Sequence, residues 1–305
     1  MPSRSYAYIL LLLILCSLFP HEGIAQELEP RAQAPAPIKM NIFILAYAYS
    51  SGNVLLDPAL PIEDPKAIAN TFTLAYATTL NFFGRLAKFD IVVPIGHGSW
   101  EATVEGQGAR VKRTGFGDPL VRLGINFIGA PALYGREYIK FKETFIAGAS
   151  IQMRLPLGQY DGDKLVNLGT NRWMFKPKVG ASLHLGRWIV ETSLSAAYFS
   201  RNADFFGGNT LWQKSLYTLQ MHLAYKFRRG FWFATSFGRN WGGETFLNGN
   251  GMKNPQNNSR FGLTLAVPIS GGHAITMSFS SGVTTRYGAD FDSLICSYQY
   301  RWGGR

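Results

Sequence analysis

Residues 215–228 of this 305-residue chain read SLYTLQMHLAYKFR, and apolar and polar side chains alternate through the whole stretch. The apolar positions are Tyr217, Leu219, Met221, Leu223, Tyr225 and Phe227, and the alternate positions are Thr218, Gln220, His222, Ala224, Lys226 and Arg228. A repeat of two residues indicates a β-strand. The pattern fits a transmembrane strand whose apolar side chains face lipid and whose polar side chains face a wet interior.

The same alternation recurs along the chain and predicts about twelve strands, an even number as in bacterial barrels. The predicted strands are residues 41–49, 71–80, 85–93, 120–128, 145–155, 175–185, 187–199, 215–227, 231–241, 260–269, 274–280 and 294–302. The connections are alternately short, as at 81–84, and long, as at 95–117 and 242–259, with one of intermediate length at 129–142. Short connections predict periplasmic turns and long ones predict external loops.

The predicted fold class is therefore all-β, a transmembrane antiparallel up-and-down β-barrel of about 12 strands preceded by a cleaved signal peptide. Residues 1–25 have a basic start at Arg4, an apolar run and the cleavage segment Gly23-Ile24-Ala25, with the cut expected after Ala25, which is typical of a secretory signal. The apolar run is shorter than the ~20 residues that a membrane-spanning helix needs. Residues 26–40 are rich in Pro and Ala and are expected to be a periplasmic N-terminal lead-in, with the barrel at 41–305.

Composition supports a folded membrane protein, since 47% of residues are apolar and only 16% are charged. Removal of the signal peptide would leave Cys296 as a lone cysteine, which excludes an intramolecular disulfide. Aromatic residues cluster near the predicted strand ends, as expected for two interfacial girdles. They are Phe82, Phe83, Trp188, Phe231, Trp232, Tyr300 and Trp302 at the turn end, and Tyr49, Trp173, Tyr198, Phe199, Trp212 and Trp241 at the loop end.

Basic residues predominate on the polar face of the strands. The candidates for the lumen and its selectivity are Lys88, Arg122, Arg154, Lys176, Lys178, Glu191, Lys226, Arg260 and Arg301. Only Asp90 and Glu191 oppose the bases, and the whole chain carries a net charge of +11. A wall of this sign favours anions in a pore. The alternative interpretation is that these bases contact anionic lipid headgroups or pair with loop carboxylates.

Other chemistries find little support in the sequence. Nucleic-acid binding is not expected, because the basic residues are distributed along membrane-like strands and the chain begins with a predicted export signal. The histidines are far apart, and the Asp161–Asp163 fragment lacks the further ligands of a calcium loop, so no metal site and no cofactor are predicted. No catalytic residue is assigned. A lipid hydrolase would depend on His222 with Ser193 or Ser195.

Several connecting segments, taken in order, resemble the outer-membrane family of transporters assigned to the meta pathway of phenol degradation. The segments are Gly117-Asp118-Pro119, Asn126 with Gly129-Ala130-Pro131-Ala132, Pro156 with Gly158 and Tyr160, Asn167 with Gly169, Asn171-Arg172-Trp173, Phe175-Lys176-Pro177 and Gly288-Ala289-Asp290-Phe291. The resemblance covers about residues 41–302. It implies a barrel that admits small aromatic or hydrophobic compounds to the periplasm.

The resemblance also directs attention to Asn171, Arg172 and Trp173 as candidates for a selectivity point at the pore mouth. The alternative is a loop clamp beside a girdle tryptophan. One departure from barrels of this kind is the tail, because Trp302 lies three positions from the end of the sequence, whereas such tails usually finish on an aromatic residue.

The leading functional hypothesis is passive uptake of small organic solutes, including aromatic anions, linked to aromatic degradation. The expected location is the outer membrane of a Gram-negative bacterium, reached by export through the signal peptide. The expected partners are a small-molecule solute, outer-membrane lipids and lipopolysaccharide, and the barrel-assembly machinery. The alternatives are a structural or adhesive barrel with a plugged lumen, and a membrane-embedded lipid hydrolase.

Overall fold

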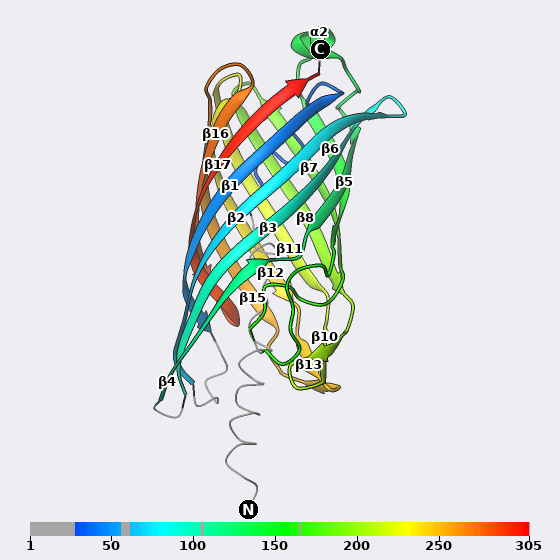
Figure 1. The fold of residues 1–305 in the computed structure, drawn as a ribbon. Helices are drawn as coiled ribbons and strands as arrows, with labels where there is room; N and C mark the ends of the chain where they lie inside the picture. The colour runs from blue at the N-terminus through cyan, green and yellow to red at the C-terminus, as the bar shows by residue number, and fades with distance from the viewer. Residues whose placement is uncertain (1–27, 56–61, 105–106, 165, 305) are drawn as a thin grey trace, which may run out of the picture.

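The computed structural model describes residues 28–55, 62–104, 107–164 and 166–304 (Figure 1). Its main sheet has 13 strands, and twelve of them form a barrel that the pairing of β2 with β3 closes. The barrel strands are β1 (Met40–Leu55), β2 (Ile62–Phe82), β3 (Arg85–Val104), β5 (Leu120–Ile128), β6 (Phe145–Arg154), β7 (Met174–Leu185), β8 (Trp188–Phe199), β11 (Leu216–Arg228), β12 (Phe231–Gly242), β15 (Gln256–Pro268), β16 (His273–Thr284) and β17 (Gly288–Gly303). All of their pairings are antiparallel, including that of β1 with β17. The predicted all-β, antiparallel barrel of twelve strands is confirmed.

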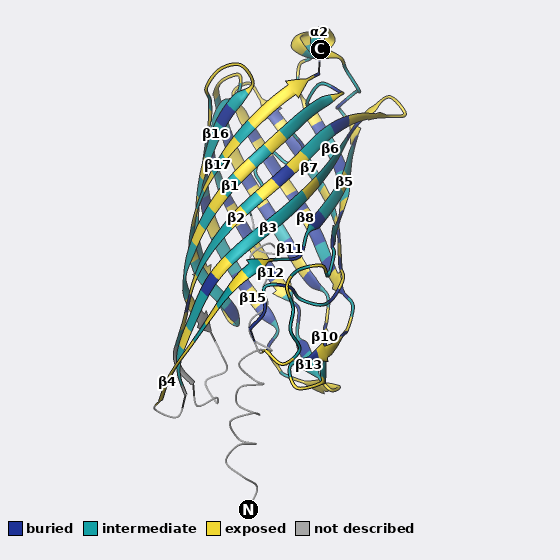
Figure 2. Cartoon of the chain, viewed as in Figure 1, coloured by how far each residue is buried: buried dark blue, intermediate teal, exposed yellow. Residues whose placement is uncertain are grey.

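The two faces of the barrel wall differ in burial, as the alternation predicts. Along β11 the apolar side chains of Tyr217, Met221 and Leu223 are exposed on the outer surface, whereas Thr218 and His222 are buried inside. Figure 2 shows the same alternation as bands of colour along the strands. In a soluble protein such a large apolar surface would be exposed to water, which is unfavourable. The outer surface of the wall therefore suits contact with the acyl chains of lipids.

Four connections at one end of the barrel are short, and most of those at the other end are long. The exception at that other end is the connection of β16 to β17, which comprises residues 285–287 alone. The short turns follow β2, β7, β11 and β15, and the end of β17 lies at this same end (Figure 1). The connection of intermediate length contains a short helix, α2 (Gly135–Lys140). We call these two ends of the barrel the turn end and the loop end.

The long loops contain strands that the sequence alternation does not predict. β3 continues past the barrel and pairs with β4 (Gln107–Phe116). A separate four-stranded sheet contains β9 (Asn202–Phe205), β10 (Asn209–Gln213), β13 (Thr245–Leu247) and β14 (Asn250–Gly251). These strands lie outside the barrel wall, where no hydrocarbon imposes an apolar face.

Aromatic side chains lie at both ends of the wall. Tyr217 and Trp241 stack at the loop end with ring centroids 5.8 Å apart, and Trp188 packs edge-on against Tyr225 at the turn end, 4.9 Å apart. Three predicted girdle residues are placed elsewhere. Phe199 and Trp232 pack in interior clusters, and Trp212 lies on β10 against Phe246. Neighbouring residues of a strand face opposite sides, so Phe199 and Tyr198 cannot both face lipid.

The N-terminal part of the described chain lies in the barrel interior. Residues 28–39, here called the inner segment, belong to the stretch 26–40 that was expected to be a periplasmic lead-in. Instead, inward-facing side chains of the wall donate to the segment's backbone carbonyls, including Lys88 to Ala32 (3.0 Å) and Asn126 to Gln33 (3.0 Å). The predicted signal peptide, residues 1–25, lies outside the described residues. Within the described ranges no helix has the length and apolar character needed to cross a membrane.

Candidate functional site

The interior of the barrel is the candidate site, and most of the predicted lumen residues face it. Arg154, Lys176 and Glu191 are buried there. Lys88, Arg122 and Lys178 line one interior cavity of about 60 Å³, and Arg260 lines another of about 10 Å³. Lys226 and Arg301 lie near the turn end, where Lys226 contacts Glu143 and Arg301 donates to Gln299 (3.3 Å).

The inner segment crosses this interior and contacts several strands. Beyond the contacts of Lys88 and Asn126, the backbone N–H of Arg31 donates to Glu191 on β8 (2.5 Å), and Thr79 on β2 donates to the Pro37 carbonyl (2.7 Å). Residues 29–36 belong to no strand. The backbone of residues 29–36 is therefore held by side chains of the wall and not by a ladder of backbone hydrogen bonds.

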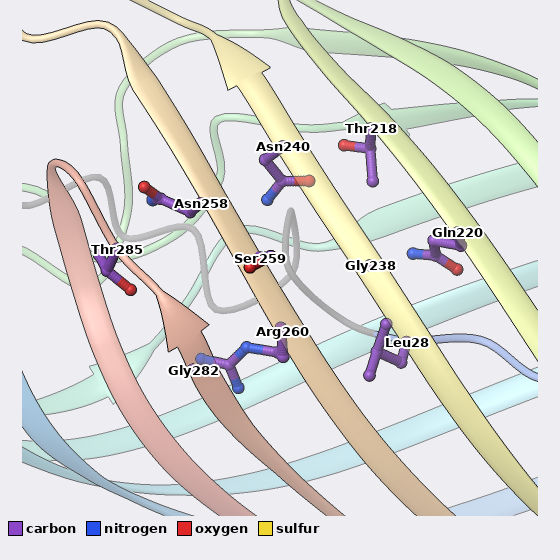
Figure 3. A pocket seen from close by; sticks show the side chains of 10 residues that line it. All are labelled: Leu28, Thr218, Gln220, Gly238, Asn240, Asn258, Ser259, Arg260, Gly282 and Thr285. Carbon is purple, nitrogen blue, oxygen red and sulfur yellow. The ribbon is translucent and has the colours of Figure 1, made fainter.

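Three inward-facing glycines make room for the inner segment. A Cβ atom at Gly238 on β12 would lie 2.8 Å from Leu28 Cδ2, and one at Gly262 on β15 would lie 2.6 Å from Leu28 Cδ1. A Cβ at Gly180 on β7 would lie 2.3 Å from Gln33 Nε2. In Figure 3, Leu28 lies beside β12 with Gln220 and Arg260 nearby. The wall and the segment are thus shaped to fit each other.

The only acidic side chain of the inner segment, Glu29, lies between two bases of the wall. Its Oε2 accepts from Arg122 Nη1 at 3.0 Å and from Lys178 Nζ. Arg122 also donates from Nε to Asp90 (2.9 Å). Burial alone would raise the pKa of the Glu29 carboxyl, but the charges of Lys178, Arg122 and Lys176 outweigh it and hold the pKa well below its usual range. Glu29 is therefore an anion at neutral pH.

A second cluster closes around Glu143, which lies just before β6. Its Oε2 is 2.9 Å from Lys226 Nζ and 3.8 Å from Arg31 Nη2, and the His184 ring lies against it at 2.9 Å. Burial alone would raise the pKa of this carboxyl. The hydrogen bonds from His184 and Lys226 and the charge of Arg31 outweigh burial and lower the pKa to about 2. The cluster ties the inner segment to β7 and β11 at the turn end.

The Glu143 cluster predicts a loss of stability in acid. A carboxyl whose pKa is depressed in the folded state stabilises the fold above its unfolded pKa, and that contribution disappears as pH falls toward the folded value. For Glu143 the window runs from 4.5 down to about 2. Denaturant titrations at pH 7 and pH 3 should show a smaller loss of unfolding free energy for Glu143→Gln than for the unaltered protein. An identical loss in both proteins would contradict this role.

The loop end of the interior is organised by Asp118, which the sequence analysis did not single out as a site residue. Its carboxylate accepts from the Gly158 N–H (2.9 Å) and from both the N–H and the hydroxyl of Thr170 (2.8 and 2.6 Å). The guanidinium of Arg154 lies 4.0 Å away, and both side chains are almost fully buried. This carboxylate joins the loop before β5 to the loop between β6 and β7.

The three mouth candidates do not form a single selectivity point. Arg172 points inward, where it donates to Gln213 Oε1 (2.6 Å) and lies 4.5 Å from the centroid of the Phe199 ring. Trp173 is exposed and stacks on Phe175, and Asn171 donates to Asn202 in the external loops (3.0 Å). The three side chains thus have separate partners, and the loop clamp describes Asn171 and Trp173 better.

The hydrolase hypothesis gains a different pair of residues. His222 Nδ1 lies 2.8 Å from Ser236 Oγ on β12, and both side chains are buried, whereas Ser193 and Ser195 had been the expected partners. A serine–histidine pair alone is not a hydrolase site, because the chemistry also needs an orienting acid and oxyanion donors. Within the described ranges, no group of three His, Cys, Asp or Glu side chains could hold a metal ion.

Acidic groups outside the predicted strands neutralise much of the basic wall. Glu29, Asp118 and Glu143 each contact interior bases, as the alternative interpretation of pairing with loop carboxylates expects. Sequence patterning missed all three, since none lies on an alternating strand. The inward-facing glycines on β7, β12 and β15 were the available signal that something other than water occupies the interior.

A closed antiparallel barrel with an apolar outer belt and a charged interior places the protein among the outer-membrane β-barrels. The chain belongs to the family described as "Putative MetA-pathway of phenol degradation", whose model matches residues 63–295. The resemblance that the connecting segments indicate is thereby confirmed.

Solved structures share the barrel fold. An outer-membrane channel from Pseudomonas putida F1 is 20% identical with a TM-score of 0.75, covering 90% of this chain and 100% of that one. The translocator domain of the autotransporter NalP from Neisseria meningitidis is 10% identical with a TM-score of 0.54, covering 88% and 91%. The transport unit of the autotransporter AIDA-I from Escherichia coli is 12% identical with a TM-score of 0.51, covering 98% of each chain. No curated protein matches the chain.

Proposed function

We propose that this protein is an outer-membrane channel for the passive uptake of small organic compounds linked to aromatic degradation. The observation that carries the proposal is the twelve-stranded wall, which is apolar outside and lined inside by polar and charged side chains. Barrels of this size enclose more space than their own side chains fill. The family description and the channel from Pseudomonas putida F1 support the same function.

The proposal places the chain in the outer membrane of a Gram-negative bacterium, exported by the signal peptide and inserted by the barrel-assembly machinery. Lipids and lipopolysaccharide would contact the outer surface, where the Tyr217–Trp241 and Trp188–Tyr225 pairs lie at the two interfaces. No catalytic residue and no cofactor are part of the proposal.

Flux through the purified, refolded protein tests the function. Proteoliposomes should take up small aromatic solutes faster than protein-free vesicles, and planar bilayers should show conductance. A variant that lacks residues 28–39 should conduct more than the full chain, because the inner segment occupies the interior. If neither protein passed ions or solutes, the structural or adhesive barrel with a plugged lumen would replace this proposal.

The interior bases should influence which ions pass. Arg260 on β15 and Lys176 on β7 both face the interior. Removing their charges with Arg260→Gln and Lys176→Gln together should shift the reversal potential in a salt gradient toward cation passage, because the wall loses positive charge. The matched control is Lys112→Gln on β4, outside the barrel wall. An unchanged reversal potential would mean that interior bases do not set the preference.

The hydrolase is a second candidate because His222 and Ser236 lie within hydrogen-bond distance. It predicts that His222→Ala alters the lipid composition of membranes that contain the protein. Unchanged lipids would end this hypothesis and leave the channel unaffected.

A further inference from the structure

The inner segment places a carboxylate beside several bases of the barrel wall. The cavity of about 60 Å³ beside the segment is lined by Lys88, Arg122 and Lys178, with Asp90 as the only acid of its lining. Glu29 supplies a second acid from the segment itself, bound by Arg122 and Lys178 through one oxygen. An arginine and a lysine that converge on one oxygen form a site for a carboxylate.

We propose that Arg122 and Lys178 form a binding site for small organic carboxylates in the lumen, and that Glu29 is a tethered occupant which a soluble carboxylate displaces. The inference rests on the proposed function and adds the substrate class and a means of opening. The segment also pairs its carboxylate with the apolar Leu28 beside it. A solute with one carboxylate and an apolar ring combines the same two features.

The site cannot hold both occupants. The cavity next to Arg122 and Lys178 measures about 60 Å³, which is smaller than the roughly 150 Å³ that holds a benzene ring. An aromatic carboxylate therefore gains room only when Glu29 and its neighbours move. Binding of the solute and displacement of the segment become one event, and the solute shifts the population toward an open lumen.

The inner segment is held in a way that permits displacement. Lys88 donates to the carbonyls of Ala32 and Ala34, and Asn126 donates to that of Gln33, so these contacts run from flexible side chains to the backbone. No strand ladder has to break in residues 29–36. Each of these hydrogen bonds contributes modestly in net terms, because water replaces the lost partner when the bond opens. A competing carboxylate would recover the two charge-assisted contacts that Glu29 gives up.

Benzoate binding to the detergent-solubilised full-length barrel tests the proposal, measured by isothermal titration calorimetry. Glu29→Gln should tighten benzoate binding about tenfold or more, because apparent affinity scales with the fraction of protein whose site is free. A merely structural role for Glu29 would weaken binding or leave it unchanged. Benzamide, the neutral analogue, should show no such gain. Glu101→Gln, which removes an exposed acid of the part of β3 that extends beyond the barrel, is the matched control.

Arg122→Gln in the Glu29→Gln protein should lose the gained affinity, with the heat-dependent electrophoretic shift of a folded barrel confirming that each variant folds. The proposal is overturned if benzoate binds none of the proteins, if Glu29→Gln leaves its affinity unchanged or weaker, if benzamide gains equally, or if Arg122→Gln has no effect. Benzoate flux into proteoliposomes is measured separately. A binding gain without flux would support the site and count against the channel, so the two failures are distinguishable.

Discussion

Met277→Arg is expected to lower the free energy of unfolding in lipid vesicles by about 2–4 kcal/mol, the cost of an arginine on the lipid face near the bilayer midplane. Met277 on β16 is 54% exposed on the outer surface. It lies four residues from His273, which stacks on Tyr300 at the turn end with ring centroids 4.7 Å apart. At about 3.3 Å per residue along a tilted strand, this position is close to the middle of a 25 Å apolar band.

The adjacent residue provides the matched control for Met277. Ser278 points to the interior, where its hydroxyl lies 3.1 Å from that of Thr264. Ser278→Arg places the same charge at the same depth but in polar surroundings, so its cost should be clearly smaller. Equilibrium denaturation of both variants refolded into phospholipid vesicles measures the difference. Equal costs would mean that the inner and outer faces of the wall are assigned wrongly.

Asp118→Ala is expected to cost about 3–5 kcal/mol, because it leaves the buried Arg154 guanidinium without its carboxylate. The variant also leaves the N–H of Gly158 and the N–H and hydroxyl of Thr170 without their acceptor. Hydrogen exchange should become faster in the loop between β6 and β7, while β11 and β12 keep their protection.

Glu101→Ala is the control for Asp118→Ala. Glu101 pairs with Arg110 on β4, and both side chains are more than half exposed. Exposed pairs of this kind contribute little. If exchange in the β6–β7 loop were the same in the Asp118 and Glu101 variants, Asp118 would not be the residue that organises this loop.

The barrel wall was predictable because lipid and water impose opposite demands on alternate residues. The strand predicted at residues 120–128 coincides with β5, and the stretch at 215–227 differs from β11 by one residue at each end. The hairpin of β3 with β4 was missed because its residues lie beyond the hydrocarbon, where no apolar face is needed. Patterning therefore identifies strands only as far as the membrane extends.

The contents of the barrel were not predictable in the same way. The sequence of residues 28–39 shows no alternation of polar and apolar side chains, because side chains of the wall hold the backbone of this segment. Parity placed Arg122 and Lys178 in the interior but gave no sign that both contact Glu29, about ninety and one hundred and fifty residues away along the chain. Contacts between a strand and a segment without periodicity form only when the barrel closes around that segment. No local pattern in the sequence indicates them.

The register of β1 against β17 has a consequence for biogenesis. Met40 pairs with Gly303 and Leu55 with Gly288, so the seam of the cylinder joins the first strand to the last. The ribosome completes residues 28–39 long before the last strand exists. The barrel must therefore either close around residues 28–39 already inside it, or admit these residues after β1 and β17 have paired.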